Sequence, residues 1–205
     1  MTKGEIRRQI LTVRDGLLPE ERRRLDREIG EKVLSHPAYR EAQIILAYAG
    51  YRSEVDTMPL IRQALTAGKI VFAPKVAGEE MEFWQILSVG DLHDGYRGIP
   101  EPEERVAFPE WLQRQGETVC NAIMWMSGAV FDRERHRIGY GKGFYDRYLA
   151  RLRSTAVCQA DGRTGLHLTT AALAYACQIV TRIPSEEHDI RPDLVITEAA
   201  LYGDT

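Results

Sequence analysis

Two short apolar segments with a helical pattern between them constrain the fold of this chain most. Residues 44–48 read IILAY and residues 70–73 read IVFA, and both segments are rich in residues that favour β-strands. Between them, apolar residues at 60–65 recur at helical spacing, and Gly68 is expected to end that helix. A distance of about 25 residues from strand to strand is typical of a right-handed βαβ crossover, so the two strands should pair in parallel.

Other segments extend this pattern into one α/β domain. Strands that are apolar throughout belong in a sheet covered on both faces, which predicts a three-layer α/β/α fold with a mixed, mostly parallel sheet. Segment 173–177 fits a helix or a strand, and the stretch 90–110, rich in Pro, Gly and acids, should be irregular. Further strands are expected at 82–87, 119–125, 156–159 and 194–197, and a further helix at 144–153.

The N-terminal residues predict a helical hairpin over residues 1–35 that precedes this domain. A second helix should start near Pro19, because proline and the acidic residues after it favour a first helical turn. In the first helix, Lys3, Arg7 and Arg14 fall together on a face separate from its apolar stripe. That stripe repeats every three or four residues, at Ile6, Ile10, Val13 and Leu17.

Length, charge and hydropathy exclude several classes of protein. A chain of 205 residues predicts a single domain over 1–205, and we expect a monomer. It has no apolar run of about 18 residues and no signal-peptide core, so we expect no membrane partner and a cytoplasmic location. The three cysteines lie far apart along the chain, and we expect them to be reduced thiols. The net charge of −3 lacks the basic excess of a nucleic-acid-binding protein.

The stretch 131–146, FDRERHRIGYGKGFYD, carries the strongest chemical signal. Gly139, Gly141 and Gly143 alternate just before a predicted helix, and Lys142 lies between two of them. Small residues let a ligand approach the backbone, and free N–H groups at a helix start attract phosphate. The stretch matches neither the P-loop nor the dinucleotide fingerprint. A glycine turn with a solvated lysine explains the local pattern equally well.

The longer string FDxxxxRIGYGKGFYDRYL resembles the signature of the 5-formyltetrahydrofolate cyclo-ligase family, also called 5,10-methenyltetrahydrofolate synthetases. Two features depart from the family pattern: Ser127 stands where proline is usual, and 162–170 resembles additional sequence. Other parts of the pattern appear in order at Lys3 and Arg7, 54–57 (EVDT), 98–102 (GIPEP), 183–184 (IP) and 188–189 (HD). The resemblance therefore spans nearly the whole chain.

The resemblance implies an ATP- and Mg²⁺-dependent enzyme that converts 5-formyltetrahydrofolate to 5,10-methenyltetrahydrofolate and releases ADP and phosphate. Transfer of the γ-phosphoryl group to the formyl oxygen would activate it for attack by N10. Such a path needs positioning and charge neutralisation rather than a covalent nucleophile. Two alternatives stay open: a paralogue that binds ATP and another small molecule, and a non-catalytic binding module.

By resemblance, Lys142 and Arg137 carry catalysis by neutralising phosphate charge. For Lys3 and Arg7, the alternative is a solvated helix face. The implied ATP-binding residues are Lys3, Arg7, Arg137, Ile138, Gly139, Tyr140, Gly141, Lys142, Gly143, Phe144 and Tyr145.

The resemblance also implies a folate site and a metal site. Ala49, Glu54, Tyr140 and Phe144 would bind the reduced folate, although Glu54 alone could be a loop carboxylate in water and each aromatic ring could belong to the core. Asp146 and Asp189 would bind Mg²⁺, which prefers carboxylate, phosphate and water oxygens. Taken alone, Asp146 could stabilise a helix start, and Asp189 could be a turn residue.

Overall fold

Seven strands form a central sheet in the computed structural model, which describes residues 1–115, 118–154, 165–184, 186 and 189–203. The sheet order is β12-β11-β9-β6-β1-β2-β3, with parallel pairing inside and antiparallel pairing of β3 and β12 at the two edges. The strands are β1 (Ile44–Leu46), β2 (Ile70–Ala77), β3 (Glu80–Ile86), β6 (Cys120–Met126), β9 (Leu166–Leu173), β11 (Leu194–Ile196) and β12 (Leu201–Tyr202). The predicted parallel pairing of β1 with β2 is confirmed.

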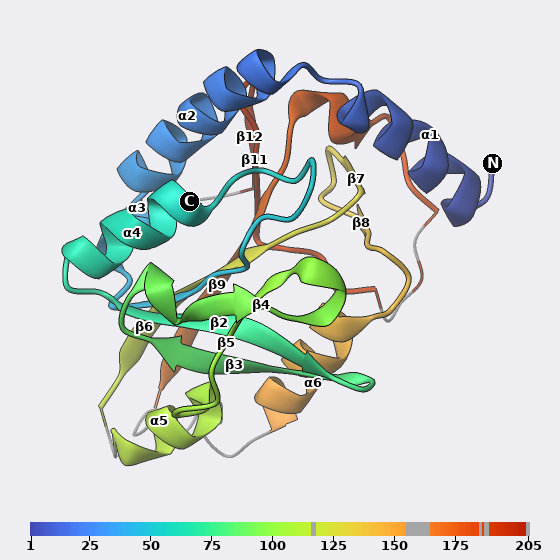
Figure 1. Ribbon diagram of the computed structural model, residues 1–205. Helices are drawn as coiled ribbons and strands as arrows, with labels where there is room; N and C mark the ends of the chain where they lie inside the picture. The colour runs from blue at the N-terminus through green and yellow to red at the C-terminus, as the bar shows by residue number, and fades with distance from the viewer. Residues whose placement is uncertain (116–117, 155–164, 185, 187–188, 204–205) are drawn as a thin grey trace.

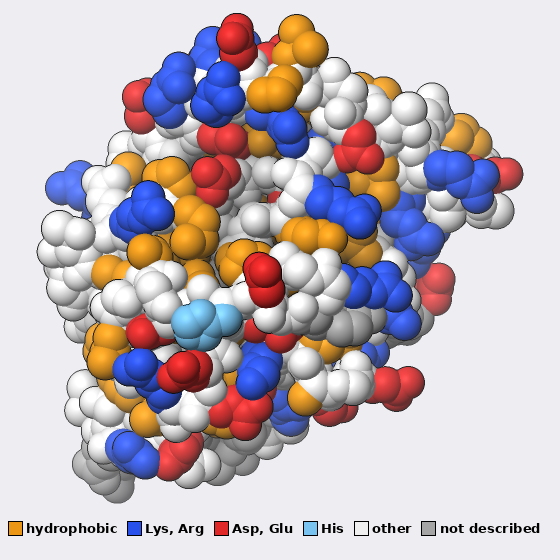
Figure 2. Space-filling view, in the orientation of Figure 1, with side chains coloured by type: hydrophobic (Ala, Val, Ile, Leu, Met, Phe, Trp, Pro, Cys, Tyr) orange, Lys and Arg blue, Asp and Glu red, His pale blue; other side chains and the backbone are white. Residues whose placement is uncertain are grey.

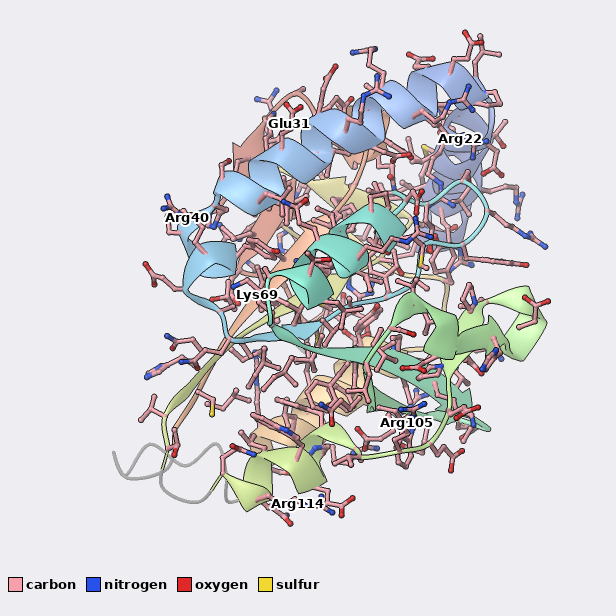
Figure 3. The ribbon with its side chains drawn as sticks, turned by 60° about the vertical axis from the view of Figure 1, so that its left-hand side comes forward. Arg22, Glu31, Arg40, Lys69, Arg105 and Arg114 are labelled. Atoms are coloured by element: carbon pink, nitrogen blue, oxygen red, sulfur yellow. The ribbon has the colours of Figure 1, made fainter. Side chains whose placement is uncertain are left out.

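Helices cover both faces of this sheet, which confirms the three-layer prediction (Figure 1). On one face lie α2 (Pro19–Ser35), α3 (Pro37–Glu41) and α4 (Met58–Thr66), which bury Ile29 and Ile61 against the sheet. On the other lie α5 (Phe108–Arg114) and α6 (Phe144–Ser154), which bury Phe108 and Tyr148. In Figure 3, Glu31 and Arg40 lie on the outer side of α2 and α3, and Arg114 lies on the opposite layer. In the described ranges, no helix is both long and apolar enough to span a bilayer.

Two small sheets complete the architecture. A three-stranded sheet joins β10 (Ile179–Val180), β7 (Val130–Asp132) and β8 (Arg137–Ile138). The second is the hairpin of β4 (Leu92–Asp94) and β5 (Pro100–Pro102). Short 3₁₀ turns are η1 (Val89–Asp91), η2 (Tyr96–Gly98) and η4 (Ala176–Gln178).

Some segments differ from the sequence-based expectation. The stretch 90–110 contains the β4–β5 hairpin and the start of α5, so the prediction that it is irregular was wrong. Residues 173–177 are divided between the end of β9 and the start of η4. Residues 166–170 begin β9 and pair with β6, whereas the strand predicted at 156–159 lies outside the described residues.

The N-terminal helix α1 (Lys3–Asp15) packs over the three-stranded sheet that contains β7. It starts with a capping box in which the Thr2 side chain accepts from the Glu5 amide and Glu5 accepts from the Thr2 amide. The structure does not confirm the expected hairpin: α1 packs on η4 and β7, whereas α2 packs on α3 and β11, and Figure 1 shows the two helices as successive parts of an arch.

The inward face of α1 also differs from the prediction. Ile6 and Ile10 pack against the apolar cluster of β7 and β8, as expected for an amphipathic helix. Val13, a member of the predicted apolar stripe, is 49% exposed, whereas Arg14 is only 4% exposed. The cationic face of α1 therefore points into the protein.

Candidate active site

The carboxyl ends of β1 and β6 define the place where a ligand is expected. In open α/β sheets, ligands bind outside these ends where the strand order reverses. Here β1 lies between β2, which follows it directly through α4, and β6, which comes later in the chain. The loop after β1 carries Glu54, and the loop after β6 carries Ser127. Figure 1 shows the loop after β1, the β7–β8 hairpin and α1 next to one another at this edge.

A compact turn after β1 fixes Glu54. A Cβ atom on Gly50 would lie 2.4 Å from the Val55 carbonyl oxygen, so the chain needs glycine here. The Gly50 amide donates to Thr57 Oγ1 at 3.1 Å, which closes the loop. The Tyr51 amide donates to Glu54 Oε2 at 3.0 Å. Burial raises the pKa of Glu54, and the hydrogen bonds that its carboxylate accepts lower it in part.

The glycine loop after β8 lies against α1. Gly141 and Gly143 have φ angles of 89° and 65°, a left-handed conformation that glycine adopts without strain. Arg7 Nη1 donates to the Gly139 carbonyl at 3.4 Å. A Cβ on Gly141 would lie 3.2 Å from the same Nη1 atom. The absence of a side chain at Gly141 therefore leaves room for Arg7.

Tyr140 joins this loop to Glu54. Its hydroxyl donates to Glu54 Oε1 at 2.6 Å and accepts from Arg14 Nη1 at 2.9 Å. Burial, followed by the nearby Glu54 charge, raises the pKa of Tyr140, so the phenol stays protonated and donates at neutral pH. The same two causes raise the pKa of Tyr145 to about 12. The residues predicted for ATP and for folate thus meet at one position.

Two predicted phosphate-binding cations are paired with the two predicted metal ligands. Arg137 Nη2 lies 3.1 Å from both carboxylate oxygens of Asp146, and the guanidinium stacks 5.4 Å from the centre of the Tyr145 ring. Lys3 Nζ lies 2.7 Å from Asp189 Oδ2, and its hydrogen bond to Asp189 is the main reason that the pKa of Lys3 is raised. Neither pairing was predicted from the sequence.

The two carboxylates fit a metal that arrives with phosphate. The Ile190 amide donates to Asp146 Oδ1 at 3.3 Å, which brings the Asp189 backbone next to Asp146. Over the described ranges, no group of three or more His, Cys, Asp and Glu side chains is placed to hold a metal ion. Mg²⁺ usually takes one or two carboxylates and completes its shell with phosphate and water. Asp146 and Asp189 match that donor set.

Other predicted ATP-binding residues differ in their access to solvent. Lys142 is exposed, and its ammonium makes no ion pair or hydrogen bond with a described residue. Arg147 donates to the Lys142 carbonyl at 2.7 Å and so fixes the backbone of the loop. Ile138 and Tyr145 are buried, so any contact from Ile138 must come from its backbone.

The remaining predicted residues line the site to different degrees. Phe144 is half-buried beneath the Arg147 guanidinium, 5.5 Å from its ring centre. Ala49 is 3% exposed and offers little surface. Lys3 and Arg7 are half-buried, which argues against a solvated helix face. Figure 2 shows Lys and Arg side chains gathered beside and below α1.

Sequence reasoning missed the roles of three polar residues. Arg14 Nε donates to Ser53 Oγ at 3.0 Å, and its Nη1 reaches Tyr140 as described. The carbonyl of Ser127 accepts from Arg137 Nη1 at 3.4 Å, and its polar atoms beside Glu54 and Tyr145 partly offset the effect by which burial raises the pKa of both. The position of Arg14 on the cationic face of α1 was the one available signal; Ser53 had none, and Ser127 was noted as a departure from the family pattern.

Comparison with known proteins identifies the family of the chain. A family model described as the 5-formyltetrahydrofolate cyclo-ligase family matches residues 1–198. The mouse protein named 5-formyltetrahydrofolate cyclo-ligase is 30% identical over 187 residues, which cover 89% of this chain and 86% of the mouse protein. The protein of that name from Escherichia coli K12 is 26% identical over 194 residues, 92% of this chain and 96% of its own. The NMR structure of Aquifex aeolicus 5,10-methenyltetrahydrofolate synthetase has a TM-score of 0.78 and 29% identity, and covers 99% of this chain and 93% of that chain. The chain therefore belongs to the 5-formyltetrahydrofolate cyclo-ligase family.

Proposed function

We propose that the protein converts 5-formyltetrahydrofolate to 5,10-methenyltetrahydrofolate in an ATP- and Mg²⁺-dependent reaction that releases ADP and phosphate. The observation that carries this proposal is the hydrogen bond between Tyr140 of the glycine loop and Glu54 of the loop after β1. This hydrogen bond connects a loop suited to bind phosphate with a carboxylate suited to accept hydrogen bonds from the N–H groups of a pteridine. We retain a cytoplasmic monomer as the prediction for location and assembly.

The triphosphate binds between α1 and the glycine loop in this proposal. Backbone N–H groups of 139–143 and the start of α6 attract phosphate oxygens. Arg7 and Lys142 add positive charge from the two sides, and neither forms an ion pair with a carboxylate in the described part of the chain. Positioned charge of this kind provides most of the catalysis in phosphoryl transfer.

The reduced folate binds at Glu54. Its two oxygens each accept one protein hydrogen bond, from Tyr140 and from Tyr51. A carboxylate has about four lone-pair positions, so each oxygen keeps one for a ligand. Adjacent N–H donors of a pteridine ring match two such acceptors, and the half-buried Phe144 offers an aromatic face nearby in sequence.

Asp146 and Asp189 would hold the metal ion, which would supply charge neutralisation at the transferred group. Arg137, which is paired with Asp146, and Lys3, which is paired with Asp189, would then turn their positive charge toward the phosphate oxygens. Both residues then remain in the site as cations beside the triphosphate.

The reaction balances without a covalent enzyme intermediate. The formyl oxygen attacks the γ-phosphorus, the bond from that phosphorus to the bridging oxygen breaks, and ADP leaves. N10 then attacks the formyl carbon, the carbon–oxygen bond breaks with release of phosphate, and N10 loses its proton to the departing phosphate or to water. The chain has to hold the two substrates in line and neutralise charge.

A spectroscopic assay tests the proposal. Purified protein with 5-formyltetrahydrofolate, ATP and Mg²⁺ should develop the absorbance of methenyltetrahydrofolate, and omission of either ATP or Mg²⁺ should abolish it. ADP should appear in a one-to-one ratio to product. No absorbance change with all three components would contradict the proposal, and tight ATP binding without folate turnover would favour a paralogue with another substrate.

A further inference from the structure

Arg14 is a buried cation with an unusual set of partners. It is 4% exposed, and its guanidinium donates to two hydroxyl groups, Ser53 Oγ at 3.0 Å and Tyr140 Oη at 2.9 Å. Among the residues that the structure describes, no carboxylate lies within ion-pair distance of Arg14. A buried charge without a direct counter-ion lowers stability. Ser53 in turn donates to the Asp15 carboxylate, so Arg14 reaches a carboxylate through a hydroxyl on each side: Asp15 through Ser53 and Glu54 through Tyr140.

The charge of Arg14 reaches Glu54 through Tyr140. The hydroxyl of Tyr140 accepts from Arg14 and donates to Glu54 Oε1 at 2.6 Å, so its proton has a fixed direction. The Arg14 guanidinium also lies 5.9 Å from the centre of the Tyr140 ring. A phenol that accepts from a cation becomes a stronger donor, since hydrogen bonds in a chain polarise one another. Arg14 thus orients the group that holds Glu54.

The phenols around Glu54 carry no charge, whereas Arg14 supplies a positive charge that favours the ionised carboxylate. Tyr48 comes after β1, Tyr140 from the glycine loop and Tyr145 from α6, and burial raises the pKa of all three phenols. They are therefore neutral at physiological pH. The positive charge of Arg14 lowers the pKa of Glu54 and partly offsets its burial.

Arg14 also shares a helix with the phosphate-side cations. Lys3, Arg7 and Arg14 lie on the inward face of α1. Arg7 contacts the loop at Gly139, and Arg14 contacts the same loop at Tyr140. Arg14 lies seven positions after Arg7, which is about 10 Å along the helix axis. One rigid element therefore contacts both halves of the site.

We infer that Arg14 is a positioning residue for the reduced-folate subsite: it holds the Tyr140 hydroxyl between itself and Glu54, so that an ionised Glu54 presents its free lone pairs to the N–H donors of the substrate. This inference rests on the proposed function. Arg14 acts through Tyr140 and needs no contact with substrate.

Kinetics of three variants test this role against pH. In Arg14→Met, the KM for 5-formyltetrahydrofolate should rise at least about tenfold, the effect of losing one charge-assisted hydrogen bond, while the KM for ATP changes less than about twofold. The acidic limb of kcat/KM for folate should move to higher pH, because loss of the cation raises the pKa of Glu54. Arg14→Lys keeps the charge but cannot donate to both Ser53 and Tyr140. The acidic limb of its kcat/KM profile should therefore stay near that of the wild type, while its KM for folate is raised. Tyr140→Phe should raise the folate KM as Arg14→Met does.

Two controls make the outcomes distinct. Arg8→Met removes an exposed arginine from the same helix and should leave all three parameters unchanged. If Arg14→Met does not fold, as judged by its thermal unfolding, Tyr140→Phe decides, because it removes only the enclosed hydroxyl and keeps the partly exposed ring. The inference is overturned if the wild type is active and either Tyr140→Phe or a folded Arg14→Met keeps the wild-type KM for folate and the wild-type acidic limb. The proposed function would then still stand. A wild type without any folate turnover would overturn both.

Discussion

At the scale of the residue, two cations of the site are paired with carboxylates before any substrate arrives. Lys3 is paired with Asp189, and Arg137 is paired with Asp146. Each pair contains one residue predicted to bind phosphate and one predicted to bind metal. Binding of a metal–triphosphate complex can exchange these partners without leaving a buried charge unpaired, which would otherwise be costly.

The Asp189→Asn substitution should raise the Mg²⁺ requirement. Removal of the carboxylate charge weakens the metal site. Loss of a residue that only hydrogen-bonds to a metal ligand already lowers metal affinity about ten- to a hundredfold, so loss of a ligand should lower it at least as much. The Mg²⁺ concentration for half-maximal rate should therefore rise at least about tenfold in the cyclo-ligase assay. Asp94→Asn, an exposed carboxylate on β4, provides the matched control. An Mg²⁺ titration identical to that of the wild type would remove Asp189 from the metal site.

The Lys142→Ala substitution should separate activity from stability. The side chain is exposed and forms no ion pair with a described residue, so its loss should leave the unfolding temperature unchanged. Activity should fall about a hundredfold or more, as for other losses of one positioned donor at a developing charge. Lys75→Ala removes a lysine paired with Glu104 on the surface and should retain activity. A Lys142→Ala protein that melts early or aggregates would show instead that the residue serves the fold.

At the scale of the element, the glycine loop combines backbone conformation with space for a neighbour. Gly141 has a φ angle of 89°, and the atom that a side chain would first meet is Arg7 Nη1 at 3.2 Å. Gly78, in the turn between β2 and β3, has a φ angle of 64°, and a Cβ atom added there would meet nothing within 4 Å among the described residues. The two glycines therefore share a left-handed backbone and differ in what surrounds them.

Gly141→Ala and Gly78→Ala test which of these features matters for ATP. Both variants should lose about 1–2 kcal/mol of stability, the cost of a left-handed conformation for an ordinary residue. Gly141→Ala should in addition raise the KM for ATP several-fold, because the new methyl group displaces Arg7. Equal ATP kinetics in the two variants, measured at matched temperature below both unfolding transitions, would show that space for Arg7 is unimportant.

The elements differ in how far the sequence predicts them. β1 and the start of β2 were predictable because both are short apolar runs whose residues are mostly buried, whereas the rest of β2, from Pro74 onward, is partly or fully exposed and lay outside the predicted strand. The β4–β5 hairpin was not, because Pro100 and Pro102 normally exclude a strand and are tolerated here in a two-stranded sheet. For α1, periodicity does not separate the two faces correctly, because Ile6 and Ile10 of the apolar stripe pack inward beside the cationic residues, whereas Val13 of the same stripe is exposed. Contacts from Ser53 and Tyr140 decide that Arg14 is buried and Val13 exposed.

At the scale of the whole molecule, residues far apart in the chain form one site. Lys3 and Arg7 come from α1, Glu54 from the loop after β1, Tyr140 from the glycine loop and Asp189 from the segment before β11. The family signature identifies these residues one by one. Their pairing depends on tertiary geometry, so neither Lys3–Asp189 nor Arg137–Asp146 could be derived from spacing along the chain. Glu54 follows β1 at the carboxyl-end edge of the parallel strands, the edge where open α/β sheets bind ligands.

This assembly predicts that bound nucleotide stabilises α1 more than the rest of the protein. The helix packs through the partly buried Ile6 and Ile10 on a small apolar cluster, whereas α5 buries Phe108 and Leu112 in a large one. Local opening of α1 should therefore cost less free energy than opening of α5. In the proposed complex, ATP with Mg²⁺ contacts α1 through Lys3 and Arg7, so it would bind only while the helix is docked. At a ligand concentration of about a hundred times Kd, amide exchange in α1 should slow by about a hundredfold.

Hydrogen exchange measured by mass spectrometry, with and without ATP and Mg²⁺, checks this at the level of single peptides. Amides of α5, on the far side of the sheet, provide the internal control and should change little. Lys3→Ala should reduce the ligand-dependent protection of α1, since it removes one of the contacts that link the helix to the triphosphate. Equal protection of α1 and α5 would mean that the nucleotide stabilises the domain as a whole. Protection confined to the glycine loop would mean that α1 does not contact the nucleotide, because only elements that lose contacts on opening gain protection from a ligand.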